Sequence, residues 1–168
     1  MSDPATIRIE AAASRDVPAL LGLIRALAAY EKLAHAVVAT EASLEAALFG
    51  PRPVAEALLA WDGTQPVGFA VFFHTFSTFR GLPGLYLEDL FVESAWRGRG
   101  LGKRLLGHVA GVALARGCGH LEWSVLDWNE PAIRFYAALG AQPREEWSSY
   151  RLSGDALTRL AGDGPRKA

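Results

Sequence analysis

The sequence contains a single cysteine, Cys118, among its 168 residues. One cysteine cannot form a disulfide within the chain, which is typical of proteins of the reducing cytoplasm. Long apolar runs are missing too, because the most apolar stretches, residues 55–61 and 67–73, are far shorter than the roughly 20 residues that cross a bilayer. The first four residues have neither the basic nor the apolar segment of a signal peptide. We therefore expect a cytoplasmic protein without a membrane segment.

The chain also lacks an excess of charge of either sign. It has 17 Lys and Arg residues against 18 Asp and Glu residues, a net charge of −1. This balance argues against a general nucleic-acid or membrane-surface binder. The four histidines show no metal-ligand spacing, so no metal site is expected. A serine-hydrolase motif of the Gly-x-Ser-x-Gly type is absent. Cys118 has no neighbouring base or cation pattern, so we expect a buried, unreactive thiol.

The composition is that of one soluble globular domain. Hydrophobic residues make up 51% and charged residues 21% of the chain. A chain of this length buries about 70% of the surface that it exposes when unfolded, so it needs no disulfide or metal for stability. We expect a single domain over residues 1–168, with an ordered core at about 5–161. The polar tail, residues 162–168, is expected to be disordered.

Hydrophobic periodicity and capping residues predict a mixed α/β (α+β) order of elements. Strands are expected over residues 7–10, 54–61, 67–74, 85–92, 121–126 and 147–152. Helices are expected after the capping residue Asp16, from Thr40 to Gly50, and over residues 101–116, 132–139 and 155–161. Asp62-Gly63-Thr64-Gln65 is typical of a hairpin turn. Residues 75–84 contain Gly81, Pro83 and Gly84 and are expected to form a loop.

A glycine-rich basic stretch stands between the strand that ends at Val92 and the helix over residues 101–116. Its sequence is Arg97-Gly98-Arg99-Gly100-Leu101-Gly102-Lys103. Glycines allow the backbone to approach a ligand closely, and the free N–H groups and dipole of a helix start favour a phosphate. The spacing matches neither a Walker loop nor a dinucleotide fingerprint. A flexible, solvated turn is the alternative, but the position between strand and helix favours a pyrophosphate site.

Two adjacent carboxylates, Glu88 and Asp89, lie within the apolar strand over residues 85–92. Because side chains alternate along a strand, we expect the two to face opposite sides and to have separate environments. A carboxylate in an apolar run is costly unless it is paired. Two alternatives remain for such a carboxylate. It forms a salt bridge with a neighbouring element, or it acts as a general base whose pKa is raised by its surroundings.

The residues just before the helix over residues 132–139 are of the types that commonly begin a helix. Asn129 or Glu130 caps this helix, and Pro131 lies in its first turn. By periodicity alone Tyr136 is a core aromatic residue, although its hydroxyl group would need a polar partner if it were buried.

Three segments together resemble the GNAT superfamily of acetyl-CoA-dependent N-acetyltransferases. They are Leu85-Tyr86-Leu87-Glu88-Asp89-Leu90-Phe91-Val92, Trp96-Arg97-Gly98-Arg99-Gly100-Leu101-Gly102, and the run from Asn129 to Ala141, Asn-Glu-Pro-Ala-Ile-Arg-Phe-Tyr-Ala-Ala-Leu-Gly-Ala. Within the superfamily the chain is most similar to the diamine (polyamine) branch and its relatives that act on thialysine or ornithine. The resemblance implies a mostly antiparallel central sheet, splayed between the fourth and fifth strands, with helices on both faces. It also implies a homodimer.

The resemblance further implies roles for particular residues. Acetyl-CoA would be the cofactor, with its pyrophosphate on the loop formed by Arg97, Gly98, Arg99, Gly100, Leu101, Gly102 and Lys103. Its pantetheine arm would pair with the strand end at Phe91 and Val92 and contact Asn129. Glu88 would deprotonate the acceptor amine, directly or through water, and Tyr136 would protonate the departing thiolate. The reaction is then direct acyl transfer to an amine.

The sequence departs from the polyamine enzymes around the expected acceptor site. Ala34, His35 and Ala36 stand where those enzymes carry an acidic pair, and the segment 77–81 lacks their Asp and Trp. Fewer carboxylates bind a multiply charged polyamine less well. We therefore expect a small mono- or diamine, or an amino acid with a side-chain amine, as acceptor. Its contacts would be Tyr30, Glu31, Phe79 and Asp89. A protein or peptide N-acetyltransferase and a non-catalytic CoA-binding regulatory module remain alternatives.

Overall fold

The computed structural model describes residues 6–145 and 148–162. Two compact units are distinguished, one up to Ser124 and one from Val125 onward. The first unit contains a five-stranded sheet in the order β1-β2-β3-β4-β5. Its strands are β1 (Arg8–Ala11), β2 (Glu56–Asp62), β3 (Gln65–Ser77), β4 (Leu82–Val92) and β5 (Leu121–Trp123). The first four strands pair antiparallel, and β5 runs parallel to β4. The expected mixed, mostly antiparallel sheet is confirmed.

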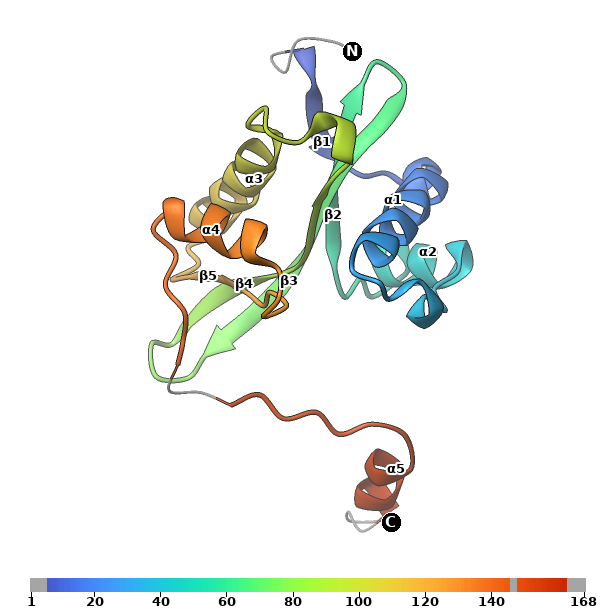
Figure 1. Cartoon of the computed structure of the whole chain (residues 1–168). Coiled ribbons are helices and arrows are strands. Elements are labelled where there is room, and N and C mark those ends of the chain that lie inside the picture. The colour runs from blue at the N-terminus through green and yellow to red at the C-terminus, as the bar shows by residue number, and fades with distance from the viewer. Residues whose placement is uncertain (1–5, 146–147, 163–168) are drawn as a thin grey trace. The chain divides into compact units, whose positions relative to one another are not determined.

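Helices cover both faces of this sheet, as Figure 1 shows. On one face lie α1 (Val17–Tyr30) and α2 (Glu41–Phe49), and on the other lies α3 (Leu101–Ala115). The core beneath α1 and α2 is a cluster of apolar side chains: Leu20, Leu23, Leu27, Leu48, Ala57, Leu59, Phe69 and Phe91. Beneath α3, Leu105 and Val109 are fully buried. The short 3-10 helices are η2 (Ser14–Asp16), η3 (Ala34–Ala36) and η4 (Ser94–Trp96).

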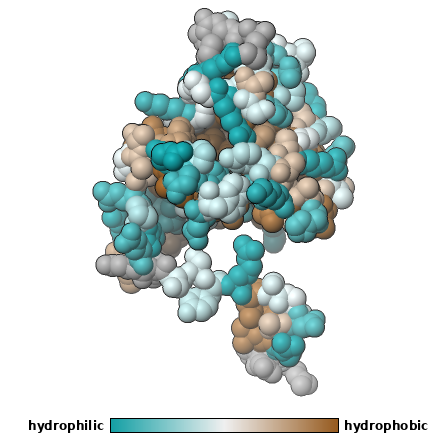
Figure 2. Space-filling view, viewed as in Figure 1, coloured by the Kyte–Doolittle hydropathy of each residue, from teal (hydrophilic) through white to brown (hydrophobic). Residues whose placement is uncertain are grey.

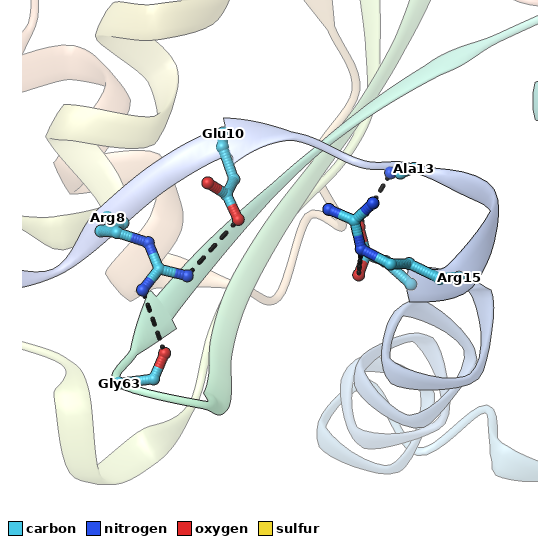
Figure 3. A network of polar contacts seen from close by, with 6 residues as sticks. Arg8, Glu10, Ala13, Arg15 and Gly63 are labelled. Carbon is cyan, nitrogen blue, oxygen red and sulfur yellow. Dashed lines mark hydrogen bonds and ion pairs between the residues drawn. The ribbon is translucent and has the colours of Figure 1, made fainter.

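Local polar contacts explain where the first elements begin. Thr40 caps α2, because its Oγ1 accepts a hydrogen bond from the Ser43 N–H at 3.1 Å. Asp16 precedes α1, but its carboxylate accepts from the Ala13 N–H at 2.8 Å, which holds the chain between β1 and α1. Arg8 donates to the Gly63 carbonyl at 3.3 Å and so ties β1 to the β2–β3 turn (Figure 3).

The β3–β4 hairpin is longer than the sequence predicts. The expected loop over residues 75–84 is wrong, because only residues 78–81 connect the two strands. Thr75 pairs with Gly84, Phe76 with Pro83 and Ser77 with Leu82. Glycine and proline usually interrupt strands. Here the long neighbouring strand supplies cross-strand partners, which outweigh the low strand propensity of Pro83 and Gly84.

The fifth strand is shorter than predicted and separates early from the fourth. β5 ends at Trp123 instead of residue 126, and its three residues pair with Leu85, Tyr86 and Leu87. In the described part of the chain, β4 continues to Val92 with no β5 residue beside it. The two strands therefore splay apart after Leu87, which confirms the expected opening between the fourth and fifth strands.

The second unit contains α4 (Glu130–Ala138) and α5 (Gly154–Gly162), which confirms the two expected helices. The predicted strand over residues 147–152 begins at Trp147, outside the described residues. Its remainder, residues 148–152, forms neither helix nor strand, and Tyr150 is 96% exposed. A run of β-forming residues becomes a strand only beside a partner strand. The tail from residue 163 onward lies outside the described residues.

α5 presents apolar surface, since Leu157 and Leu160 are both exposed (Figure 2). Among the helices that the structure describes, none has both the length and the apolar character needed to cross a membrane.

Candidate active site

Among the described residues, no strand pairs with the C-terminal end of β4 on the side away from β3, so β4 has a free edge there. The Glu93 N–H donates to the Val67 carbonyl at 2.9 Å, and Val92 lies opposite Gly68. In an antiparallel ladder the hydrogen-bonding direction alternates from one residue to the next. The backbone N–H and C=O groups of Val92, and of Leu90 two residues earlier, therefore point away from β3. They point to the side that β5 leaves open.

A β-bulge shifts the register of β4 at its two carboxylates. Asp89 lies opposite Val71 and Leu87 opposite Phe72, so Glu88 is an extra residue without its own cross-strand partner. Because Val71 and Phe72 lie on opposite faces of β3, Leu87 and Asp89 also lie on opposite faces. Glu88 is exposed whereas Asp89 is half-buried, so the two side chains have different environments, as expected, although the charge of Glu88 still contributes to the raised pKa of Asp89.

Asp89 lies on the α1 face of the sheet in a mostly apolar environment. Burial raises the pKa of Asp89 to about 6, with further contributions from the charges of Glu88 and Glu31. Glu31 directly follows α1, and burial raises its pKa as well. No Lys, Arg or His of the described residues forms an ion pair with Asp89. Within the described part of the chain the salt-bridge alternative therefore has no partner for Asp89, and these three carboxylates form a cluster that an ammonium group would neutralise.

Arg97 turns its side chain away from the glycine-rich loop. Its Nε donates to the Val92 carbonyl at 2.8 Å. Its guanidinium carbon lies 4.2 Å from the centre of the Tyr30 ring and 5.3 Å from that of Phe91. Tyr30 is the last residue of α1, so this one side chain joins the free edge of β4 to the end of the helix that leads into Glu31.

The rest of the loop has the conformation that its glycines permit. Gly98 and Gly100 have φ values of 73° and 79°, in the left-handed region that favours glycine. Gly100 caps α3, so the N–H groups of Leu101, Gly102 and Lys103 lie in the first helical turn, where no carbonyl of the helix can accept from them. These donors are available to an anion. Lys103 is exposed, and the Arg99 guanidinium lies 5.8 Å from the centre of the Trp96 ring.

Arg104, which directly follows the glycine-rich stretch, has a structural contact that the sequence does not reveal. It donates to the carbonyl of Ile7, 97 residues away, at 2.7 Å. This hydrogen bond connects the start of α3 to the segment just before β1. No local pattern signals it, because the partner is a backbone carbonyl.

In the second unit, Asn129 and Tyr136 belong to α4. Asn129 is the N-cap, as one of the two expected alternatives had it, and its Oδ1 accepts from the Ala132 N–H at 3.3 Å. It is 7% exposed, the one polar residue among the buried residues described. Tyr136 is half-buried rather than enclosed in a core, and its ring lies 5.1 Å from that of Phe135.

The structure groups three of the four expected acceptor residues. Tyr30, Glu31 and Asp89 lie at the end of α1 and on the sheet face that α1 covers. Phe79 lies in the β3–β4 turn and is 95% exposed. Ser77 lies six residue steps along β3 from Val71, the partner of Asp89, which is a distance of about 20 Å at roughly 3.3 Å per step. Within one chain Phe79 is thus far from the carboxylate cluster.

Comparison with known proteins identifies the family of this site. Residues 22–141 match the model of the Acetyltransferase (GNAT) family, so the chain belongs to that family. It is an N-acetyltransferase, and the matched segment covers the splayed strands, the glycine-rich loop and α4.

Individual relatives show which branch of the family the chain resembles. The chain is 39% identical over 169 residues to the thialysine N-epsilon-acetyltransferase of Bos taurus, covering 94% of this chain and 99% of the relative. It is 35% identical to the L-ornithine N5-acetyltransferase of Arabidopsis thaliana, covering 91% and 87% of the two chains. Among solved structures, an integron cassette protein from the mobile metagenome of V. cholerae superposes with a TM-score of 0.79 at 28% identity, covering 93% and 98%. The branch expected from the sequence is confirmed.

Proposed function

We propose that this protein transfers an acetyl group from acetyl-CoA to a primary amine of a small molecule, by direct attack of the amine. The observation that carries the proposal is the cluster of Glu31, Glu88 and Asp89 beside the free edge of β4. Burial and mutual repulsion raise the pKa of Asp89 to about 6, and an ammonium group would relieve both effects. The free edge beside the cluster offers backbone donors to an extended acyl donor.

The residues of the loop and strand edge fit acetyl-CoA. Phosphate groups suit the first-turn N–H groups of α3, with the positive end of the helix dipole and nearby cations. A Cβ atom built on Gly98 or Gly100 meets nothing within 4 Å, so the loop surface is open to a ligand. The pantetheine arm would lie along the backbone at Phe91 and Val92. The proposed cofactor contacts are Phe91, Val92, Gly98, Arg99, Gly100, Leu101, Gly102, Lys103 and Asn129.

The proposed chemistry begins with the acceptor. An alkylamine is protonated at neutral pH and cannot attack, so Glu88 removes a proton from it, directly or through a water molecule. Tyr30, Glu31 and Asp89 orient the amine. When bound, acetyl-CoA supplies the activated thioester carbonyl. The Val92 N–H would stabilise negative charge on the thioester oxygen, and the Tyr136 hydroxyl would give its proton to the leaving sulfur and take up the second proton that the amine nitrogen loses. Holding the two reactants together supplies much of the acceleration.

The acceptor we propose is an amino acid with a side-chain amine, or a small diamine. The segment that follows the Tyr30–Glu31 pair is η3, Ala34–Ala36, which carries no carboxylate to hold a second or third ammonium group. The named relatives act on thialysine and ornithine, which are amino acids of this kind.

The test is a panel of acceptors with purified protein and acetyl-CoA. It includes thialysine, ornithine, lysine, putrescine, spermidine, spermine and a lysine-containing peptide, with release of free CoA thiol as the readout. The proposal expects the highest kcat/KM with an amino acid or short diamine. Preference for spermine or for the peptide would contradict the proposed acceptor. CoA binding without turnover on any amine would indicate a regulatory CoA-binding module instead.

We further propose that the protein is a cytoplasmic homodimer. The resemblance to the family implies a dimer, and the β3–β4 hairpin carries exposed apolar side chains, namely Phe76, Phe79 and Leu82. Light scattering coupled to size-exclusion chromatography measures the mass directly. A monomer at micromolar concentration would contradict the dimer.

The proposed acceptor contact of Phe79 is tested separately, by the KM of the Phe79→Ala variant for the acceptor.

A further inference from the structure

Arg97 belongs to the glycine-rich loop by sequence, but its side chain makes its contacts elsewhere. The Nε atom donates to the Val92 carbonyl at 2.8 Å, on the free edge of β4. The guanidinium lies 4.2 Å from the centre of the Tyr30 ring and 5.3 Å from that of Phe91. The three partners come from two elements, α1 and β4.

These contacts connect the two halves of the proposed reaction. Val92 lies where the thioester of the donor is proposed to lie, and the hydrogen bond to its carbonyl orients the peptide group at this edge. Tyr30 ends α1 and precedes Glu31, one of the three carboxylates proposed to hold the amine. A shift of α1 relative to the end of β4 would change the distance between amine and thioester, on which the rate depends steeply.

Only arginine can make both contacts with one side chain. Its planar guanidinium stacks on an aromatic ring while the Nε–H donates sideways in the same plane. Lysine keeps the charge but has neither the plane nor the Nε donor. A side chain used in this way is also directed toward α1 rather than toward the first turn of α3, where Arg99 and Lys103 supply positive charge.

We propose that Arg97 is a positioning residue that holds the acceptor end of α1 against the donor edge of β4, and is not a ligand of the CoA pyrophosphate. This inference rests on the proposed function. It differs from the role that the family resemblance implies for Arg97, and it assigns the pyrophosphate to the loop from Gly98 to Lys103.

The experiment is a double-mutant cycle between Arg97→Lys and Tyr30→Leu, with two separate readouts. One readout is kcat and KM for the amine, and the other is the dissociation constant of CoA by calorimetry without amine. Each single variant should lower kcat/KM for the amine about tenfold, and the double variant should lose little more than either one. The affinity of Arg97→Lys for CoA should stay within about threefold of wild type.

Two matched variants separate the alternatives. Tyr30→Phe keeps the aromatic ring on which the Arg97 guanidinium lies. Arg97→Lys should therefore lower kcat/KM for the amine as much in the Tyr30→Phe background as in the wild-type protein. Arg99→Gln lies in the same loop and should weaken CoA binding about tenfold while leaving the KM for the amine nearly unchanged. Circular dichroism and thermal melting establish that each variant is folded, and Arg97→Gln replaces Arg97→Lys in the cycle if the latter does not fold.

Two results would overturn the inference. One is a loss of CoA affinity in Arg97→Lys as large as in Arg99→Gln, which would make Arg97 a pyrophosphate ligand. The other is a double variant whose losses multiply, which would mean that Arg97 and Tyr30 act independently. Failure of the proposed function is a different result, because wild-type protein would then acetylate no amine of the panel. The CoA affinity of Arg97→Lys would still decide whether Arg97 binds phosphate.

Discussion

The charge of Glu88 raises the pKa of Asp89, although neighbouring residues of a regular strand point to opposite faces. The extra residue in β4, set against Val71 and Phe72 of β3, breaks the alternation at this point. It does so directly after Leu87, the last β4 residue that pairs with β5. The carboxylates and the free strand edge therefore begin at the same place in the fold, which is where an amine and an acyl donor would have to meet.

Replacing Asp89 should stabilise the protein at neutral pH but not in acid. The pKa of Asp89 is about 6 in the folded state against an ordinary value of 3.8, so folding disfavours its ionised form. Stability is therefore lost as the pH rises from about 4 to above 6. Asp89→Asn removes this loss, and we expect it to raise the free energy of unfolding by roughly 2–3 kcal/mol at pH 7.5. Urea denaturation at pH 4 and pH 7.5 measures the difference.

The control for this prediction is Glu88→Gln, which removes only one neighbouring charge and should stabilise less at pH 7.5. An equal effect of Asp89→Asn at both pH values would show that its ionisation does not matter.

The pH dependence of catalysis should report the same carboxylate cluster. If the ionised cluster holds the ammonium group, kcat/KM for the amine should fall as the pH drops through about 6, the pKa of Asp89. Glu31→Gln removes one of the charges that raise this pKa, so the acidic limb should move to lower pH. Initial rates from pH 5 to 8 with saturating acetyl-CoA measure the shift. A limb that stays in place in Glu31→Gln would argue against Asp89 as its origin.

The Tyr136 hydroxyl should matter for the chemical step and not for binding. Tyr136→Phe removes one oxygen from a half-buried side chain of α4 and keeps the ring that packs against Phe135. A general acid contributes about 10² to 10⁴ in rate, so we expect kcat to fall within that range. The dissociation constant of CoA should not change. Unchanged turnover would remove Tyr136 from the mechanism, and weakened CoA binding with normal kcat would make it a binding residue.

Two glycine-to-alanine substitutions should have opposite effects on stability. At Gly84, in β4, an added Cβ would come within 2.4 Å of two atoms of the His120 ring and within 2.7 Å of Thr75 Oγ1. Gly84→Ala should therefore destabilise the protein by about 1–3 kcal/mol, as overpacking does. Gly107, in the exposed surface of α3, has nothing within 4 Å. Gly107→Ala should stabilise by about 0.5–1 kcal/mol, because alanine favours helix.

Thermal or urea unfolding of both variants in the same buffer provides the comparison. Destabilisation by both would mean that Gly107 has a packing role that its surroundings do not show.

Local sequence patterns predicted the elements of this fold that depend on near neighbours. The cap at Thr40, the cap at Asn129 and the helix that starts at Leu101 all follow from residues within one helical turn. The motifs that resemble the family were equally visible, since their glycines, arginines and acidic residues lie close together in the chain. The predictions were wrong where a residue distant in the chain determines the secondary structure. Pro83 and Gly84 were expected in a loop, but they belong to β4 because they pair with residues of β3.

The sequence by itself determined the helices, the glycine-rich loop before α3 and the family, because each is encoded by residues next to one another. Only the tertiary structure decided the geometry of the candidate site. It showed the extra residue at Glu88, the end of β5 at Trp123 and the direction of the Arg97 side chain. The physical reason is the same in each case: the deciding contact is made with a residue distant in the chain. Val71 lies opposite Asp89 at the bulge, and the Tyr30 ring lies against the Arg97 guanidinium. The residues next to Asp89 and Arg97 in the sequence do not indicate either partner.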